Sequence, residues 1–268
     1  MSPTETMAGR VCVVTGASSG LGHRAALDLA AEGARVVAVA RREDRLRTLL
    51  DDMGGVSAGH SLHVTDVSQR AEVQALARHV EETYGRCDVL VNNAGRGGGG
   101  SFKGPESVTF VEDVMAVNFF GAVYCTAELM PLLERSAPAF VVNIASVAGR
   151  VAPPGESAYC ASKFALVGWS EGLETELARR GVYISTIEPG FVPTEGFPHT
   201  DMKANPLMSR MLGSDEDVSK AIRKAIRGRR HQRTVPRFYY LVQVPRVLAP
   251  GVYRFLRDRA LTGIWARR

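Results

Sequence analysis

The sequence predicts an α/β fold, with a parallel sheet covered by helices on both faces, in a single domain. Short apolar runs such as VCVVTG at 11–16 alternate along the chain with segments of helical pattern. Each run is apolar throughout rather than at every second position, which is typical of strands buried on both faces. With 268 residues and 45% hydrophobic content, the chain can bury one substantial core.

Six strands are expected, each a short run rich in β-branched residues that stops near a glycine or a polar residue. They lie at 11–16, 34–42, 62–67, 89–95, 140–146 and 182–190. Helices are expected at 20–32, 43–52, 69–84 and 157–180, and a further helix is expected from Ser214 to Gly228. Ligands of open parallel sheets bind beyond the carboxyl ends of the strands, where this chain carries small and polar residues.

Composition favours a cytoplasmic protein. We expect no apolar stretch that reaches the roughly 18 residues needed to cross a bilayer. The start, MSPTETMAGR, lacks the basic and apolar parts of a signal peptide. The four cysteines, at 12, 87, 125 and 160, form no CxxC pair and have no histidine cluster beside them. We therefore expect reduced, structural thiols and no metal site.

Charge divides the chain into an acidic body and a basic end. Residues 1–219 contain 19 Lys and Arg against 27 Asp and Glu, whereas residues 220–268 contain 14 against 1. We expect the sheet domain to span 1–235 and a basic, apolar extension to span 236–268. The extension either packs on its own domain, as a cap over the cleft or on a dimer surface, or binds an anionic membrane surface. Nucleic acid is not expected as a partner, because no recognised nucleic-acid module accompanies the charge.

The stretch TGASSGLG, Thr15 to Gly22, lies between the first strand and the first helix. Its glycines permit a tight turn, and the helix start directs free N–H groups and a partial positive charge at the loop. A pyrophosphate would fit there. The alternative is that these glycines only make a tight turn, which is less expected after the first strand of an alternating chain.

A second constellation is YCASK, in which Tyr159 and Lys163 lie on one face of the expected helix. A free phenol has a pKa of about 10, and lowering it to near 7 requires roughly 4 kcal/mol of preferential stabilisation of the phenolate. The Lys163 ammonium is the expected source, so that Tyr159 would serve as a proton donor or acceptor. Ser146 could hydrogen-bond and orient a substrate oxygen. The alternative is an ordinary exposed pair of side chains on a helix.

Together, TGxxxGxG at 15–22, NNAG at 92–95, Ser146, YCASK and PG at 189–190 resemble the classical short-chain dehydrogenase/reductase family. The resemblance implies a doubly wound, Rossmann-like fold, a nicotinamide cofactor, and a homodimer or homotetramer built on helices near 106–134 and 157–180. It implies the catalytic residues Asn118, Ser146, Tyr159 and Lys163. It also implies cofactor contacts at Gly16, Ser18, Ser19, Gly20, Leu21 and Gly22; Asp66 and Val67 beside the adenine; Asn93, Ala94 and Gly95 beside the ribose; Tyr159 and Lys163; and Pro189, Gly190, Val192 and Thr194 beside the nicotinamide.

The choice of nicotinamide cofactor depends on the end of the second strand. An acidic residue there would hydrogen-bond the ribose 2′-OH of NAD, whereas a basic one would pair with the 2′-phosphate of NADP. This strand ends in Ala40-Arg41-Arg42. A guanidinium can bind the phosphate in a forked geometry, so NADP(H) is favoured over NAD(H), with Arg41 the favoured contact and Arg42 beside it. The alternative is that both arginines form a solvated helix entry.

The segment at 191–213, with three prolines and three methionines, is expected to form a substrate lid, or else a plain surface connection. The sequence therefore predicts an NADP(H)-dependent oxidoreductase that interconverts a ketone or aldehyde with an alcohol, on a lipophilic small molecule. A second interpretation is a non-catalytic, NADP(H)-responsive binding protein with the same fold. A third is a peripheral membrane module.

Overall fold

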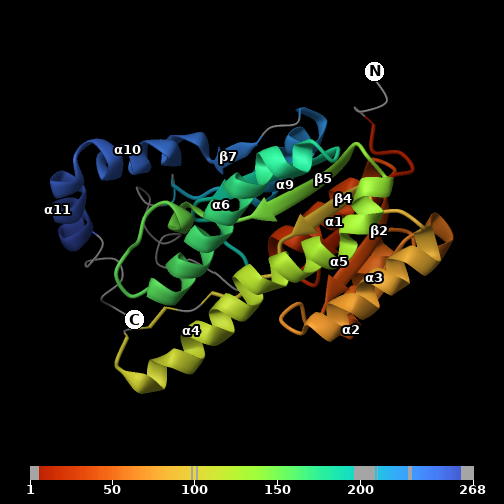
Figure 1. Ribbon diagram of the computed structural model, residues 1–268, viewed down its shortest axis with the longest axis horizontal. Helices are drawn as coiled ribbons and strands as arrows, with labels where there is room; N and C mark the ends of the chain where they lie inside the picture. The colour runs from red at the N-terminus through yellow and green to blue at the C-terminus, as the bar shows by residue number, and fades with distance from the viewer. Residues whose placement is uncertain are drawn as a thin grey trace.

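The structure, a computed structural model, describes residues 6–97, 99–100, 102–195, 209, 211–228 and 231–260. Its centre is a seven-stranded sheet whose strands are all parallel (Figure 1). The strands are β1 (Val11–Thr15), β2 (Arg35–Ala40), β3 (Ser61–Val64), β4 (Val89–Asn92), β5 (Ala139–Ile144), β6 (Val182–Pro189) and β7 (Gln232–Val235). The α-helices are α1 (Gly20–Ala31), α2 (Glu43–Asp52), α3 (Arg70–Tyr84), α4 (Val108–Met115), α5 (Gly121–Arg135), α6 (Ser157–Ala178), α9 (Asp215–Gly228), α10 (Tyr240–Leu248) and α11 (Pro250–Ala260).

The strand order, β3-β2-β1-β4-β5-β6-β7, confirms the predicted doubly wound, Rossmann-like α/β fold. From β1 the chain runs outward to β3 and then returns to the other side of β1 as β4, which pairs with Cys12, Val13 and Val14. The carboxyl ends of β1 and β4 therefore meet where the order reverses. Open α/β sheets bind their ligands at this point.

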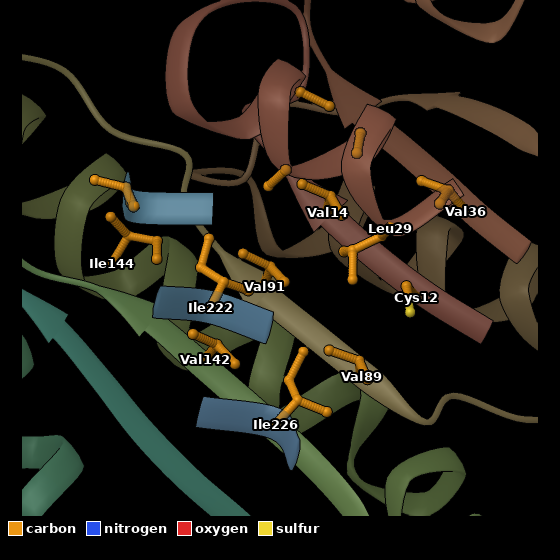
Figure 2. Close-up of a cluster of buried hydrophobic side chains, with 14 of the residues drawn as sticks. Cys12, Val14, Leu29, Val36, Val89, Val91, Val142, Ile144, Ile222 and Ile226 are labelled. Atoms are coloured by element: carbon orange, nitrogen blue, oxygen red, sulfur yellow. The ribbon is translucent and has the colours of Figure 1, made fainter. Parts of the chain in front are cut away.

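Alternate strand residues enter two apolar cores, one on each face of the sheet. Val14 of β1 points into a core with α1, α2 and α9, to which α9 contributes Ile222 and Ile226 (Figure 2). Val11 and Val13 lie in the opposite core, with side chains from α3, α5 and α6. Because helices cover both faces of the inner strands, these strands are apolar throughout, as the sequence predicted.

The strand β7 was not expected from the sequence. It is a run of four residues, QRTV, and it carries no apolar pattern of its own. It becomes a strand because it pairs with Thr186–Pro189 at the end of β6, where Thr234 and Val235 are buried. Long-range pairing, rather than local propensity, therefore decides this element.

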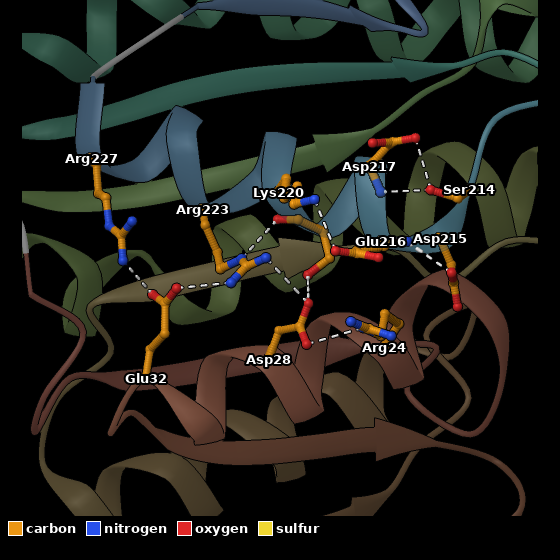
Figure 3. A network of polar contacts seen from close by, with 11 residues as sticks. Arg24, Asp28, Glu32, Ser214, Asp215, Glu216, Asp217, Lys220, Arg223 and Arg227 are labelled. Atoms are coloured by element: carbon orange, nitrogen blue, oxygen red, sulfur yellow. Dashed lines mark hydrogen bonds and ion pairs between the residues drawn. The ribbon is translucent and has the colours of Figure 1, made fainter.

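A polar network joins α9 to α1 (Figure 3). The Arg223 guanidinium lies 2.9 Å from the Glu32 carboxylate and 3.4 Å from that of Asp28. Arg227 pairs with the other oxygen of Glu32 at 2.7 Å, and the buried Ser219 hydroxyl donates to Asp28 at 2.7 Å. Because α1 begins at the phosphate loop, the contacts from α9 help to hold that helix in place.

The expectation that no stretch could cross a bilayer was wrong. Among the described residues, the helical stretch Pro105–Arg135 is long and apolar enough to do so by length and composition. Polar residues such as Asn118 interrupt the run, so it carries no uninterrupted apolar signal. Within this stretch α5 packs Cys125 and Leu129 into the core beneath the sheet.

Candidate active site

The phosphate loop lies at the carboxyl end of β1 and leads directly into α1. Gly16 and Gly20 have φ angles of 66° and 57°, a conformation that favours glycine. Gly22 is needed because a Cβ atom there would lie 2.4 Å from the Asn93 amide nitrogen and 2.5 Å from the Gly16 carbonyl oxygen. Ser19, at the start of α1, makes no side-chain cap hydrogen bond. The loop is thus packed tightly against Asn93 on one side. The free N–H groups at the start of α1 suit an anion.

Asn93 and Thr15 fasten the phosphate loop to the end of β4. The Asn93 side-chain amide donates to the carbonyl oxygens of Thr15 (3.0 Å) and Gly16 (3.3 Å). The Thr15 hydroxyl accepts hydrogen bonds from the backbone N–H groups of Asn93 (2.9 Å) and Ala94 (3.0 Å). The NNAG segment therefore shapes the phosphate loop itself. Its contact with a bound ribose, from Asn93 to Gly95, stays a prediction.

The two arginines after β2 take different directions. Arg42 turns toward the phosphate loop, where its guanidinium donates to the hydroxyls of Ser18 (3.1 Å) and Ser19 (2.9 Å). Arg41 is largely exposed and lies 3.6 Å from the carboxylate of Asp66. The sequence favoured Arg41 as the phosphate contact, but it is Arg42 that the fold brings to the loop. Which guanidinium binds a 2′-phosphate stays a prediction.

Sequence reasoning missed Glu195 as a site residue. Its carboxylate pairs with Arg42 at 2.9 Å and with Arg45 at 2.7 Å. The hydrogen bond from Arg42 and the charges of both arginines hold the pKa of Glu195 below its usual value. Glu195 and Arg42 are 153 positions apart, so no local signal in the sequence could have indicated this contact.

Asp66 and Val67 lie just beyond the carboxyl end of β3. The Asp66 carboxylate accepts hydrogen bonds from the Ser68 N–H (3.0 Å) and hydroxyl (2.7 Å). Burial would raise the pKa of Asp66, but these hydrogen bonds and the nearby Arg41 charge outweigh it and lower the pKa. Val67 is buried, and a Cβ atom at Gly121 would lie 2.7 Å from its side chain. Both residues are therefore held in place at the binding edge.

Ser146 and Tyr159 come together beyond the carboxyl end of β5. The Ser146 hydroxyl accepts from the Ala148 N–H (3.1 Å) and donates to the Pro189 carbonyl oxygen (3.3 Å). Ser146 also hydrogen-bonds the Tyr159 phenol, but burial has the larger effect and raises the pKa of Tyr159 to about 12. The shift is opposite to the lowering that the sequence led us to expect.

Lys163 is also buried, and its charge does not reverse this shift. Its ammonium is buried, with 4% of the residue exposed, and it donates to the Ile144 carbonyl oxygen at 2.9 Å. It lies over the Tyr159 ring, 5.8 Å from the ring centre. Burial lowers the pKa of Lys163 to about 8, so that its charge is itself partly lost in mildly alkaline solution. The i,i+4 spacing brings the two side chains near each other, but desolvation by burial is the largest effect on the pKa of each.

Asn118 occupies the middle of a π-helical turn, Ala116–Phe120, which joins α4 to α5. Its side-chain oxygen accepts from the Arg96 N–H at 2.7 Å. Its amide nitrogen donates to the Arg96 carbonyl oxygen (2.9 Å) and to the Ser162 hydroxyl (3.0 Å). Asn118 therefore fastens the loop after β4 to α6, next to Lys163. The wide turn that presents it is of a kind often found at functional sites.

The loop after β6 packs against the C-terminal extension. The Gly190 N–H donates to the Val235 carbonyl oxygen at 2.8 Å, and a Cβ atom at Gly190 would lie 2.3 Å from the Tyr239 ring. Tyr239 is 3% exposed, and its hydroxyl donates to the Met211 carbonyl oxygen at 2.9 Å. The sequence placed Tyr239 in the extension but did not indicate that it would hold Gly190.

The structure brings the predicted residues to one edge of the sheet. Most of them lie at or just after the carboxyl ends of β1 to β6. The remaining predicted residues lie on α6 and on the π-helical turn Ala116–Phe120. Val192 is buried. A Cβ atom at Gly20 would lie 3.2 Å from the Thr194 side chain, so Thr194 lies close to Gly20.

Residues 196–208 and 210 of the expected lid lie outside the described residues. Fold and site define a dinucleotide-binding α/β protein with a phenol, a hydroxyl and an ammonium at the same edge of the sheet as its phosphate loop.

Comparisons with known proteins agree with this class. A sequence model described as short chain dehydrogenase matches residues 10–204. A Streptomyces coelicolor protein described as a putative ketoacyl reductase is 38% identical over 192 residues, covering 70% of this chain and 73% of its own. The 3-oxoacyl-(acyl-carrier-protein) reductase FabG of Thermotoga maritima is 31% identical over 223 residues, covering 80% and 89%. The solved Pseudomonas aeruginosa RhlG/NADP active-site complex has a TM-score of 0.80 at 30% identity, covering 90% of this chain and 100% of that one.

The chain belongs to the short-chain dehydrogenase family. It is therefore an oxidoreductase of a family whose members bind a nicotinamide cofactor, act on small molecules and are commonly oligomeric.

Proposed function

We propose that this protein is an NADP(H)-dependent enzyme that interconverts a carbonyl compound and an alcohol. The observation that carries the proposal is the meeting of Tyr159, Ser146 and Lys163 at the carboxyl end of β5. A Cβ atom at Gly95 would lie 3.8 Å from the Lys163 nitrogen, so this group adjoins the NNAG segment that holds the phosphate loop. A proton donor at the same sheet edge as a dinucleotide phosphate loop has the parts that carbonyl reduction needs.

The residues present fit a nicotinamide dinucleotide phosphate. The uncapped start of α1 suits the pyrophosphate, and side chains at Gly16 or Gly22 would collide with the NNAG segment behind the loop. Arg42, with the hydroxyls of Ser18 and Ser19, supplies donors for the 2′-phosphate, and Arg41 lies beside them. When bound, the cofactor would supply or accept the hydride.

The chain's own residues would handle the proton. Tyr159 would donate its phenolic proton to the carbonyl oxygen during reduction and accept it from the alcohol during oxidation. Ser146 would hydrogen-bond the same oxygen and hold it in line with the phenol. Lys163 would supply positive charge near the Tyr159 ring, and Asn118 would keep the loop after β4 in place.

A lipophilic substrate is favoured by the surroundings of Ser146. Val147, Val151 and Tyr239 form an apolar cluster with the partly buried Phe191 and Tyr253. Two similar proteins are described as ketoacyl reductases, so a 3-oxoacyl chain belongs among the substrates to be tested.

The Tyr159→Phe variant tests the catalytic assignment. It should lower kcat by at least about a hundredfold, because it removes the donated proton, while the Kd for NADPH changes little. The measurements are a fluorescence titration with NADPH and NADH, followed by turnover on carbonyls from short and water-soluble to long-chain 3-oxoacyl compounds. Activity that survives in the variant would contradict the role of Tyr159. Tight NADPH binding without turnover on any carbonyl or alcohol would favour the non-catalytic binding protein.

A further inference from the structure

The two helices of the C-terminal extension expose a large apolar surface. No residue of α10 is buried, and Val247 and Leu248 are each 78% exposed. Leu241, Val244 and Leu248 recur at the spacing of one helix face and are all exposed, and α11 adds Val252 and Phe255. In Figure 1 both helices, drawn in blue, lie at one end of the molecule, beyond the helices that cover the sheet. Single exposed apolar residues are common, but a group of this size marks an interaction surface.

The opposite side of the extension is attached to the domain close to the active site. The Arg246 guanidinium lies over the Phe164 ring, 4.4 Å from its centre, and donates to the Arg150 carbonyl oxygen. The Tyr253 hydroxyl accepts a hydrogen bond from the Ala152 N–H at 3.1 Å. Both contacts hold the loop that follows Ser146. The extension therefore packs on its own domain, as one interpretation of the sequence required, and still leaves an apolar face uncovered.

Charge indicates what covers this face. The described part of the extension includes Arg237, Arg246, Arg254 and Arg257 against the single acidic residue Asp258. Arg246 faces the domain and Arg257 pairs with Asp258, whereas Arg237 and Arg254 are exposed. A second copy would bring the same excess of positive charge to the contact, which opposes self-association. An anionic bilayer accepts both features, because apolar side chains enter the interface while guanidinium groups meet the headgroups. We propose that the α10–α11 face docks this protein on an anionic membrane surface.

Docking also has a consequence for the substrate, which rests on the proposed function. The extension contacts Gly190 through Tyr239 and the loop after Ser146 through Arg246 and Tyr253. A bilayer on the exposed face would therefore lie on the outer side of the extension, and the extension would separate it from the loop after Ser146. A lipophilic carbonyl compound dissolved in the bilayer would then be concentrated near the enzyme.

Flotation of the full chain with lipid vesicles tests the docking. Wild type should bind vesicles of phosphatidylcholine with phosphatidylglycerol more tightly than vesicles of phosphatidylcholine alone. Val247→Glu/Leu248→Glu should weaken binding to the anionic vesicles at least about tenfold, because it places two carboxylates in the apolar contact. Val56→Glu is the matched control, since Val56 is 72% exposed on a different element and its variant should bind like wild type. NADPH binding by all three proteins checks that they are folded.

The outcomes separate docking from the other possibilities. Absence of vesicle binding, equal binding by wild type and the double variant, or equal binding to neutral and anionic vesicles would overturn the proposal. A double variant that loses self-association in light scattering, without any vesicle binding by wild type, would assign the face to a second copy and overturn it too. Vesicle binding that depends on Val247 and Leu248 supports docking even if no carbonyl is turned over, in which case only the proposed function fails.

Discussion

At the scale of single residues, the charge of Lys163 links the pH of the solution to the catalytic group. Burial lowers the pKa of Lys163 to about 8 and raises the pKa of Tyr159 to about 12. The phenol is therefore protonated throughout the neutral range, which suits it to donate a proton in reduction. The group that changes its charge state within reach of that range is the lysine.

We expect the rate of carbonyl reduction to hold below about pH 8 and to fall as the pH rises through the pKa of Lys163. Above this pKa the ammonium loses its proton, and with it the positive charge near the phenol ring. The measurement is kcat against pH at saturating NADPH. Lys163→Arg is the control, because a guanidinium stays charged and should remove the fall. A flat wild-type profile, or the same fall in an active Lys163→Arg variant, would contradict the assignment.

Glu195 is the residue whose charge should oppose cofactor binding most directly. Its carboxylate already pairs with Arg42 and Arg45. Glu195→Gln should tighten NADPH binding by up to about fivefold and leave NADH binding unchanged, because only NADPH carries the 2′-phosphate that competes for these arginines. Titration with 2′,5′-ADP and 5′-AMP isolates the effect from turnover. Arg42→Ala should weaken NADPH binding and leave NADH binding unchanged. If Glu195→Gln changed the affinities for 2′,5′-ADP and 5′-AMP equally, Glu195 would not face the 2′-phosphate.

At the scale of elements, a buried ion pair fastens the loop after β5 to β6. The Arg150 guanidinium lies 2.8 Å from the fully buried carboxylate of Glu188. Thr234 and Gln232 of β7 also donate to Glu188, at 3.1 Å and 2.6 Å. A charged residue inside the apolar run VYISTIEPG could have signalled a partner, but not which one. Glu188 therefore joins the loop after β5 to β6 and β7.

Arg150→Met should lower the free energy of unfolding by roughly 3 kcal/mol, because it leaves a buried carboxylate without its cation. Urea denaturation measures this, and adding Glu188→Gln to the variant should recover part of the loss. Arg135→Ala is the matched control, because the Arg135–Glu81 pair is more than half exposed at both ends and should contribute less than about 1 kcal/mol. Equal losses in the two single variants would show that the Arg150–Glu188 pair has no special role.

At the scale of the whole molecule, an aromatic cluster lies where the family resemblance implies assembly. Phe119 and Phe120 precede α5, Trp169 lies on α6, and the Phe119 and Trp169 ring centres are 6.1 Å apart. Phe120 is exposed and stacks with Tyr124. Exposed aromatic side chains are typical of the centres of protein interfaces.

Phe120→Asp should therefore shift the assembly toward monomers, raising the concentration needed for the dimer or tetramer by at least about tenfold. Sedimentation velocity over a range of concentrations measures the shift. Val56→Glu again provides a control with a charge on an unrelated exposed position. Two outcomes would show that α4–α6 do not form the interface. One is a wild-type chain that stays monomeric at high concentration, and the other is a Phe120→Asp variant that assembles as wild type does.

The sequence by itself predicted the order of the first six strands, the phosphate loop and most of the residues that lie at the binding edge. These features depend on local periodicity and on motifs a few residues long, such as the glycines of TGASSGLG or the i,i+4 spacing of YCASK. A parallel sheet then brings the strand ends together, which is why residues as distant as Asn93 and Ser146 could be assigned to one edge in advance.

Only the tertiary structure decided the pairing of β7, the contact of Glu195 with Arg42, and the direction of the Tyr159 pKa shift. Each of these three features depends on burial or on contacts between residues far apart in the sequence. A local sequence pattern shows neither burial nor such contacts. The extension illustrates both sides of this division. Its composition indicated an apolar and basic surface, but which side chains anchor it and which remain exposed was decided by packing around Tyr239, Arg246 and Tyr253.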